Sequence, residues 1–262
     1  MSLKELFEQT RGEGRSALVG YLPAGYPSAE GSKEMLAAMV DGGADLVEVG
    51  MPYSDPVMDG PTIQLAADTA LKQGFRLKQL FEVVESVSAR GGRAVVMTYW
   101  NPVHRYGVDR FARDLAAAGG LGMITPDLIP DEAAEWMVAS KEHGLDRIFL
   151  VAPSSSEERL DLTARAASGF LYATSVMGVT GARDKVGAGA AELVRRARAH
   201  TDLPIGVGLG VRSREQAAEV AAFADAVIVG SALVTKAAES AEAVRALSEE
   251  LAEGVRRPVV PA

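Results

Sequence analysis

The sequence predicts an α/β fold of the (β/α)8 or TIM barrel class, and three observations lead to that prediction. Short apolar runs rich in Val, Ile, Leu or Tyr alternate with longer amphipathic stretches along the chain. Most of these runs are bounded by Gly or Pro, as buried parallel strands are. There are eight runs in 262 residues, close to the roughly 250 residues typical of this barrel. The predicted strands are Ala17–Pro23, Asp45–Val49, Arg93–Thr98, Leu121–Thr125, Arg147–Val151, Phe170–Thr174, Pro204–Gly208 and Ala226–Val229.

An open, doubly wound sheet is the alternative architecture. The first strand lacks the Gly-x-Gly-x-x-Gly turn into a helix that marks the dinucleotide-binding form of that sheet. The strands are evenly spaced except between the second and third, where Pro61 begins a predicted helix that Gly74 ends. No composition shift or low-complexity linker divides the chain. We therefore expect one TIM-barrel domain over residues 1–262 with an elaborated second loop.

Composition and charge exclude several classes of protein. Asp and Glu number 35 and Lys and Arg 27, so the net charge is −8, and neither nucleic acid nor an anionic membrane is an expected partner. The chain has no Cys and three His, which excludes thiol chemistry and makes a metal site unexpected. No uncharged apolar run approaches the ~20 residues of a membrane span. With no signal peptide in the charged N-terminal segment, we expect a soluble, cytoplasmic protein.

The second predicted strand carries a carboxyl group. Side chains alternate between the two faces of a strand, so Val47 and Val49 facing the helices would turn Glu48 into the barrel, near its catalytic mouth. Burial raises the pKa of a carboxyl group, which suits a general acid–base catalyst. A structural Glu paired with a buried cation is the other interpretation, but no basic residue at a strand end is an obvious partner.

The loop after this strand and two later strands hold further candidates. Asp55 and Asp59 are both possible second carboxylates, and both equally fit turn and helix-cap roles. Tyr172, Tyr99 and Asn101 could assist, although each alone is better explained as a packing or turn residue. No Lys lies in any predicted strand, so a Schiff-base mechanism is not expected and the chemistry falls to carboxylates.

Glycines at the ends of three adjacent strands predict a phosphate site. They lie in Gly178-Val179-Thr180-Gly181 after the sixth strand, Gly208-Leu209-Gly210 after the seventh and Gly230-Ser231 after the eighth. Glycine lets backbone N–H groups approach an anion, and barrels commonly bind phosphate on their last loops.

Several motifs together resemble the tryptophan synthase alpha chain family, over about Leu18 to Ser231. They are Leu46–Gln64 (LVEVGMPYSDPVMDGPTIQ), Met97–Pro102 (MTYWNP), Thr125–Leu128 (TPDL), Val151–Pro153 (VAP) and Gly178–Arg183 (GVTGAR). The resemblance implies retro-aldol cleavage of indole-3-glycerol phosphate to indole and glyceraldehyde 3-phosphate, with no cofactor in this chain. It also implies a partner, a beta chain that carries pyridoxal phosphate, in an α2β2 complex.

The same resemblance implies roles for individual residues. Glu48 would be the catalytic acid–base and Asp59 would hold the indole N–H, with Tyr172 helping to position Glu48. Thr180, Gly181, Gly210, Gly230 and Ser231 would contact the substrate, the glycines and Ser231 at its phosphate, while Tyr21 and Leu209 would flank the indole. The chain departs from the family pattern at Tyr21, Ile129 and Val176, where the family commonly has Phe, Pro and Arg.

Three other hypotheses are considered. The chain could be a lyase that acts alone, another phosphate-binding barrel such as a sugar-phosphate isomerase, or a non-catalytic activator of a beta chain. Intact Glu48 and Asp59 argue against the last of these.

Overall fold

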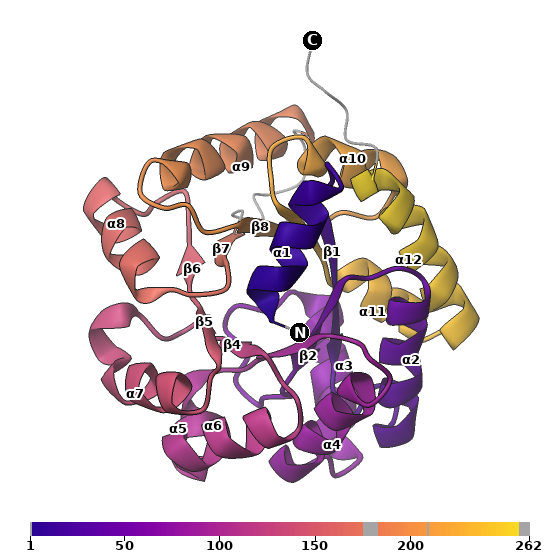
Figure 1. Ribbon diagram of the computed structural model, residues 1–262. Coiled ribbons are helices and arrows are strands. Elements are labelled where there is room, and N and C mark those ends of the chain that lie inside the picture. The colour runs from indigo at the N-terminus through magenta and orange to yellow at the C-terminus, as the bar shows by residue number, and fades with distance from the viewer. Residues whose placement is uncertain (1, 175–182, 209, 257–262) are drawn as a thin grey trace.

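The computed structural model describes residues 2–174, 183–208 and 210–256, and in these ranges it contains one sheet of parallel strands wound into a barrel (Figure 1). The strand order is β5-β4-β3-β2-β1-β9-β8-β7-β6. The strands are β1 (Ala17–Pro23), β2 (Leu46–Gly50), β3 (Ala94–Met97), β4 (Gly122–Ile124), β5 (Asp146–Ile148), β6 (Leu150–Val151), β7 (Leu171–Thr174), β8 (Ile205–Gly208) and β9 (Ala226–Val229). The barrel prediction is thereby confirmed, and the doubly wound sheet was the wrong alternative.

The fifth predicted strand differs from the expectation because it is divided in two. β5 pairs with β4, β6 pairs with β7, and Phe149 lies between them. The Tyr172 N–H donates to the Phe149 carbonyl at 3.0 Å, so the connection to β7 continues through the break. This one chain segment therefore joins both ends of the sheet and closes the barrel.

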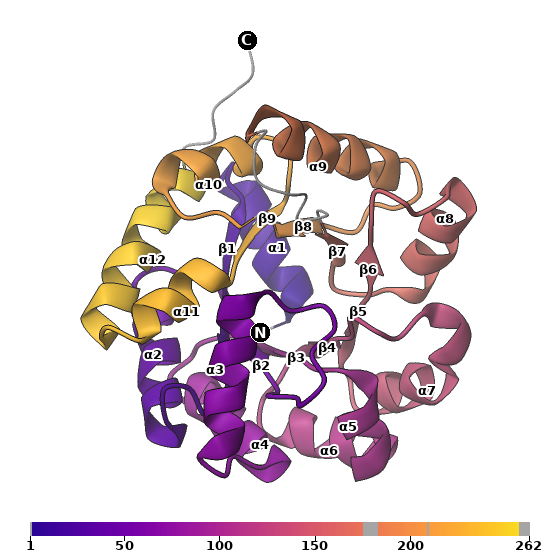
Figure 2. The same cartoon turned by 180° about the vertical axis from the view of Figure 1, so that it is seen from behind.

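Helices surround the strands in Figures 1 and 2. Pro61 is the first residue of its helix, as predicted, and the Ser28 hydroxyl caps the helix that follows β1 by accepting from the Gly31 N–H at 3.0 Å. The α-helices are α1 (Leu3–Gly12), α2 (Ala29–Asp41), α3 (Pro61–Lys72), α4 (Leu77–Ser88), α5 (Trp100–Tyr106), α6 (Val108–Ala117), α7 (Ala134–Glu142), α8 (Glu157–Ala166), α9 (Arg183–Arg198), α10 (Arg214–Ala221), α11 (Ser231–Ala237) and α12 (Ala241–Arg256), and a short 3-10 helix, η1, spans Pro130–Glu132.

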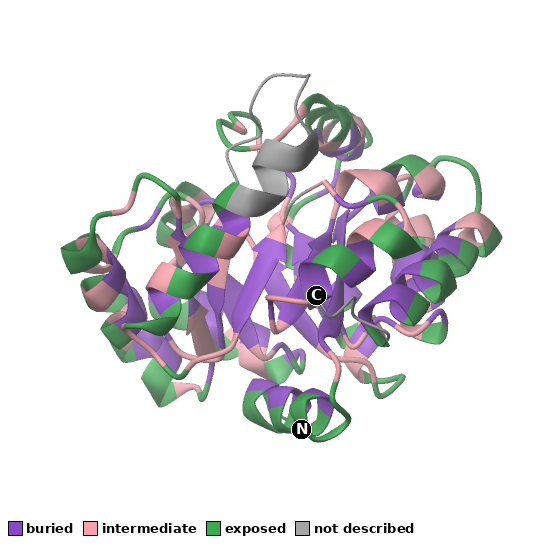
Figure 3. Ribbon diagram, turned by 90° about the horizontal axis from the view of Figure 1, so that it is seen from above, coloured by how far each residue is buried: buried purple, intermediate pink, exposed green. Residues whose placement is uncertain are grey.

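The strands separate two apolar cores. The larger core, which includes Val47 and Val49, lies between the strands and the helices. The smaller core lies inside the barrel and includes Leu46 and Val95. Figure 3 shows buried residues along the strands and exposed ones on the outer helices. Because Leu46 faces inward and Val47 and Val49 face outward, the intervening Glu48 faces inward, as the sequence predicted.

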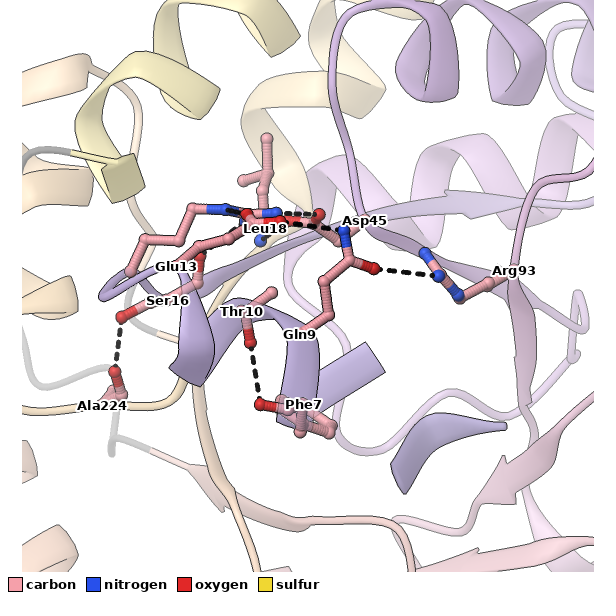
Figure 4. Close-up of polar contacts among 10 residues, drawn as sticks. Phe7, Gln9, Thr10, Glu13, Ser16, Leu18, Asp45, Arg93 and Ala224 are labelled. Carbon is pink, nitrogen blue, oxygen red and sulfur yellow. Dashed lines mark hydrogen bonds and ion pairs between the residues drawn. The ribbon is translucent and has the colours of Figure 1, made fainter. Parts of the chain in front are cut away.

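Helix α1 covers one end of the barrel, at the centre of Figure 1. Its buried face consists of Leu3, Leu6, Phe7 and Thr10, and the three apolar members belong to the inner core. The Phe7 and Phe170 rings lie with centroids 5.7 Å apart. The Ser16 hydroxyl, between α1 and β1, donates to the Ala224 carbonyl at 2.7 Å (Figure 4). α1 therefore seals the end at which the strands begin, opposite the end that holds the loops discussed next.

Among the described residues, no helix combines the length and the apolar character needed to cross a membrane.

Candidate active site

Glu48 lies at the centre of the site. Its strand, β2, runs between β1 and β3, and Glu48 pairs in register with Tyr21 on one side and Val95 on the other. The side chain is 1% exposed, and its Oε1 atom has no hydrogen-bond partner. Removal from water disfavours the carboxylate and raises the pKa of Glu48 to about 8. With this pKa, the protonated form of Glu48 predominates at neutral pH.

The structure separates the two carboxylates of the following loop. Asp55 is exposed and accepts from the neighbouring Ser54 hydroxyl at 2.6 Å. Asp59 is half-buried, and its Oδ2 atom accepts from the Tyr99 hydroxyl at 3.3 Å. Burial raises the pKa of Asp59, and the Tyr99 hydrogen bond acts in the opposite direction. Of the two candidate carboxylates, only Asp59 is therefore partly buried and bonded to a strand-end tyrosine, whereas Asp55 faces solvent.

Tyr21 and Tyr172 each lie close to both Glu48 and Asp59. Burial raises the pKa of both Tyr21 and Tyr172 well above the usual value, and negative charge on Asp59 and Glu48 raises it further in each case. Each phenol is therefore within electrostatic range of both acids.

Glycines on the neighbouring strands leave room for these rings. A Cβ atom on Gly50 would lie 2.4 Å from the Tyr21 hydroxyl oxygen, and one on Gly208 would lie 2.8 Å from that of Tyr172. The end of the barrel opposite α1 thus gathers two carboxyl and two phenol groups, and adjacent glycines make room for the two phenol rings.

The elaborated loop begins at the end of β2 and continues into α3, which lies toward the viewer in Figure 2. The Gln64 side-chain amide donates to the Asp59 carbonyl at 2.8 Å and to the Pro56 carbonyl at 3.4 Å, so the first turn of α3 holds the loop that precedes it. Gln64 was not among the predicted site residues, and its place three residues after the first helical position was the available signal.

The predicted phosphate residues fall partly within the described chain. Gly230 immediately precedes α11, which Ser231 begins, and a Cβ on Gly230 would be 3.6 Å from both Tyr21 and Ile63. Gly210 adopts a φ of +65°, a conformation that favours glycine. Thr180, Gly181, Leu209 and Val176 lie outside the described residues. In the described part of the chain, no group of three His, Asp or Glu side chains could hold a metal ion.

Comparison with known proteins decides the family. The family model described as "Tryptophan synthase alpha chain" matches residues 7–258. The chain belongs to the tryptophan synthase alpha chain family. Its function is that of this family, the carbon–carbon cleavage of indole-3-glycerol phosphate to indole and glyceraldehyde 3-phosphate in tryptophan biosynthesis.

Individual members of this family are similar to this chain in sequence and in structure. The alpha chain of Nocardia farcinica is 64% identical, covering 98% of this chain and 97% of its own. A structure of Mycobacterium tuberculosis tryptophan synthase is 61% identical, covers 97% of this chain and 98% of its own, and gives a TM-score of 0.93. A mutant alpha-subunit of Pyrococcus furiosus is 35% identical, covers 91% and 97%, and gives a TM-score of 0.82. The resemblance that the sequence motifs indicated is therefore confirmed.

Proposed function

We propose that Glu48 is the acid–base catalyst of this cleavage and that Asp59 stabilises the charge that develops on the indole ring. The observation that carries the proposal is the buried Glu48 carboxyl group, which has an unpaired oxygen and a pKa of about 8. A group titrating near neutral pH can both donate and accept a proton in one reaction cycle.

Glu48 alone can supply the proton that the reaction needs and take one back. The protonated carboxyl donates to the ring carbon that bears the glycerol chain, and the ring nitrogen becomes positively charged. The adjacent hydroxyl then gives its proton to the Glu48 carboxylate as the bond between its carbon and the ring breaks. The electron pair of that bond returns to the ring, so indole and an aldehyde leave and Glu48 is protonated again.

Asp59 suits the complementary task. A carboxylate accepts the hydrogen bond of the indole N–H, and this bond strengthens as positive charge appears on the ring nitrogen. Asp59 lies on the loop over the same end of the barrel, within electrostatic range of the two phenols that also sense Glu48. Tyr21 would flank the indole, and Tyr172 would line the site next to Glu48.

The phosphate of the substrate would bind at the ends of β8 and β9. Gly210, Gly230 and Ser231 stand there, and Ser231 opens α11, whose first N–H groups have no partner within the helix. Thr180, Gly181 and Leu209 would complete the substrate contacts from the neighbouring loops.

We further propose that the chain assembles with a tryptophan synthase beta chain as an α2β2 complex in the cytoplasm. Pyridoxal phosphate would belong to the beta chain, and this chain would need no cofactor. The support is the match to a structure described as Mycobacterium tuberculosis tryptophan synthase, together with a cysteine-free composition that suits a reducing compartment.

The deciding experiment measures indole release from indole-3-glycerol phosphate while a beta chain is titrated in. We expect release that rises with the beta chain and that falls by about 10²–10⁴-fold in Glu48→Gln. Glu249→Gln, in which the lost carboxylate belongs to an exposed ion pair with Arg245, is the matched control and should retain the wild-type rate.

Each other result points to one of the alternatives. Release that does not change with the beta chain would indicate a lyase acting alone. Near-normal release by Glu48→Gln would overturn the role of Glu48. Absence of release, with turnover of a triose or pentulose phosphate instead, would indicate a sugar-phosphate isomerase.

A further inference from the structure

Tyr99, which follows β3, connects the end of that strand to the elaborated loop. Its side chain is buried, and its hydroxyl oxygen makes two hydrogen bonds, both to that loop. The hydroxyl donates to Asp59 Oδ2 at 3.3 Å and accepts from the Met58 N–H at 2.9 Å. One atom of Tyr99 thus holds both the carboxylate of Asp59 and the backbone immediately before it.

The Tyr99 ring is itself held firmly. It stacks on Tyr53 with centroids 5.1 Å apart and an interplanar angle of 30°. The Tyr53 hydroxyl accepts from the Asn101 side-chain amide at 3.2 Å, which ties the beginning of the loop to the same corner. The next backbone N–H after Tyr99, that of Trp100, donates to Asp127 Oδ1 at 2.8 Å and fixes the corner to the end of β4.

We infer that Tyr99 is a positioning residue for the reaction, which holds the Asp59 carboxylate where it meets the ring nitrogen of the substrate. The inference rests on the role proposed above for Asp59. Catalytic groups need a fixed direction, and a loop carboxylate without a partner would sample several side-chain conformations. Tyr99 supplies the fixed partner because its ring stacks on Tyr53 and both hydrogen bonds of its hydroxyl are made to the elaborated loop.

The hydrogen bond also has an electrostatic consequence. A donor to the charged form of a carboxylate lowers its pKa, and here it opposes the burial of Asp59. Negative charge on Asp59 raises the pKa of three surrounding phenols, those of Tyr21, Tyr172 and Tyr99. Negative charge on Glu48 also raises the pKa of the first two. The expected effect of removing the Tyr99 hydroxyl is therefore a rise in the pKa of Asp59.

The test is the Tyr99→Phe variant, which keeps the ring that stacks on Tyr53 and removes only the hydroxyl. We expect kcat for indole formation to fall by about 10–100-fold, the range for a hydrogen bond to a charged group. KM should change by less than about threefold, since the Asp59 contact strengthens in the transition state. The acidic limb of the pH–rate profile should move to higher pH.

Tyr106→Phe is the matched control, because the Tyr106 hydroxyl also donates to a carboxylate, Asp114 Oδ2 at 2.6 Å, away from the site. That variant should keep the wild-type kcat and an unchanged acidic limb. A Tyr99→Phe enzyme with kcat within about twofold of wild type and an unmoved acidic limb would overturn the inference, as would the same loss in both variants.

A double-mutant cycle separates this inference from the role of Asp59. In an Asp59→Asn background, Tyr99→Phe should lower kcat by less than about twofold, because the group it positions is already gone. Wild-type activity in Asp59→Asn alone would overturn the role of Asp59. Inactive Asp59→Asn with fully active Tyr99→Phe would overturn only the role of Tyr99.

A spectroscopic measurement covers the case in which Tyr99→Phe does not fold. The Tyr99 phenol carbon, labelled with ¹³C, should change its resonance between wild type and Asp59→Asn, since the variant replaces the charged acceptor of the hydroxyl with a neutral amide oxygen. The Tyr106 resonance should stay in place. An unchanged Tyr99 resonance would show that the two groups do not interact and would refute the inference.

Discussion

Arg15 and Asp45 form a bidentate ion pair at the start of the barrel. Nη1 of Arg15 lies 2.8 Å from Oδ2 of Asp45, and Nη2 lies 2.8 Å from Oδ1. Asp45 Oδ2 also accepts from the Leu18 N–H at 2.9 Å. A single carboxylate thus joins the segment after α1, the strand β1 and the beginning of β2, three residues before Glu48.

Asp45→Asn tests how much this ion pair contributes to the free energy of unfolding. Both side chains are close to buried, at 9% and 13% exposed, so the variant leaves a desolvated guanidinium partly uncompensated. The free energy of unfolding should fall by about 2–4 kcal/mol, measured by urea denaturation. Glu249→Gln breaks the exposed pair with Arg245 and should cost less than about 0.5 kcal/mol. Equal costs in the two variants would contradict the assigned weight.

The pH dependence of turnover follows from Glu48. In the proposed mechanism the reaction begins from the protonated form of Glu48, whose pKa is about 8. The rate of indole formation should therefore decline as the pH rises through about 8, by roughly tenfold for each further pH unit. A profile of kcat/KM between pH 6 and 10 measures this, because that ratio reports the pKa of the free enzyme, and a ratio that stays level to pH 10 would contradict the acid role.

Stability should show the same titration with a definite sign. The pKa of Glu48 is raised from 4.5 to about 8, so its contribution to stability is complete below pH 4.5 and is lost as the pH rises through about 8. Glu48→Gln removes this loss. At pH 9 the variant should be more stable than wild type by roughly 4 kcal/mol, with much less difference at pH 5. Parallel stability curves for the two proteins between pH 5 and 9 would contradict the expectation.

Gly50→Ala tests the space left for Tyr21. The added Cβ would lie 2.4 Å from the Tyr21 hydroxyl oxygen and 2.7 Å from two of its ring carbons, so the ring must leave its present position. We expect a loss of about 1–3 kcal/mol in stability and a clear fall in kcat. Gly189→Ala, in α9, meets nothing within 4 Å and should leave both quantities unchanged or slightly raise stability. Full activity in Gly50→Ala would show that the Tyr21 position does not matter.

The strand positions and the direction of Glu48 were predictable because they depend on local patterns. Period-two alternation around Glu48 settles which way its side chain points, and Pro61 marks the start of α3 by its fixed backbone angle. The break at Phe149 was not predictable, because it arises from how one segment pairs with two different neighbours.

Two further features needed the folded structure. The physical difference between Asp59 and Asp55 is burial, which their order in one loop does not reveal, so before the structure only the family resemblance favoured Asp59. Tyr99 was a candidate, but only its contact with Asp59 separates it from a packing residue. Helix α1 was not predicted, although Leu3, Leu6 and Phe7 recur at the spacing of one helical face.

The position of α1 affects how the chain assembles during synthesis. α1 leaves the ribosome before every strand, yet it packs on Phe170, and the Ser16 that follows it bonds to Ala224, 208 positions later. Contacts of such long range slow folding and keep apolar surface exposed in the meantime. A nascent chain therefore carries Leu3, Leu6 and Phe7 without their native cover until nearly the whole barrel has been translated.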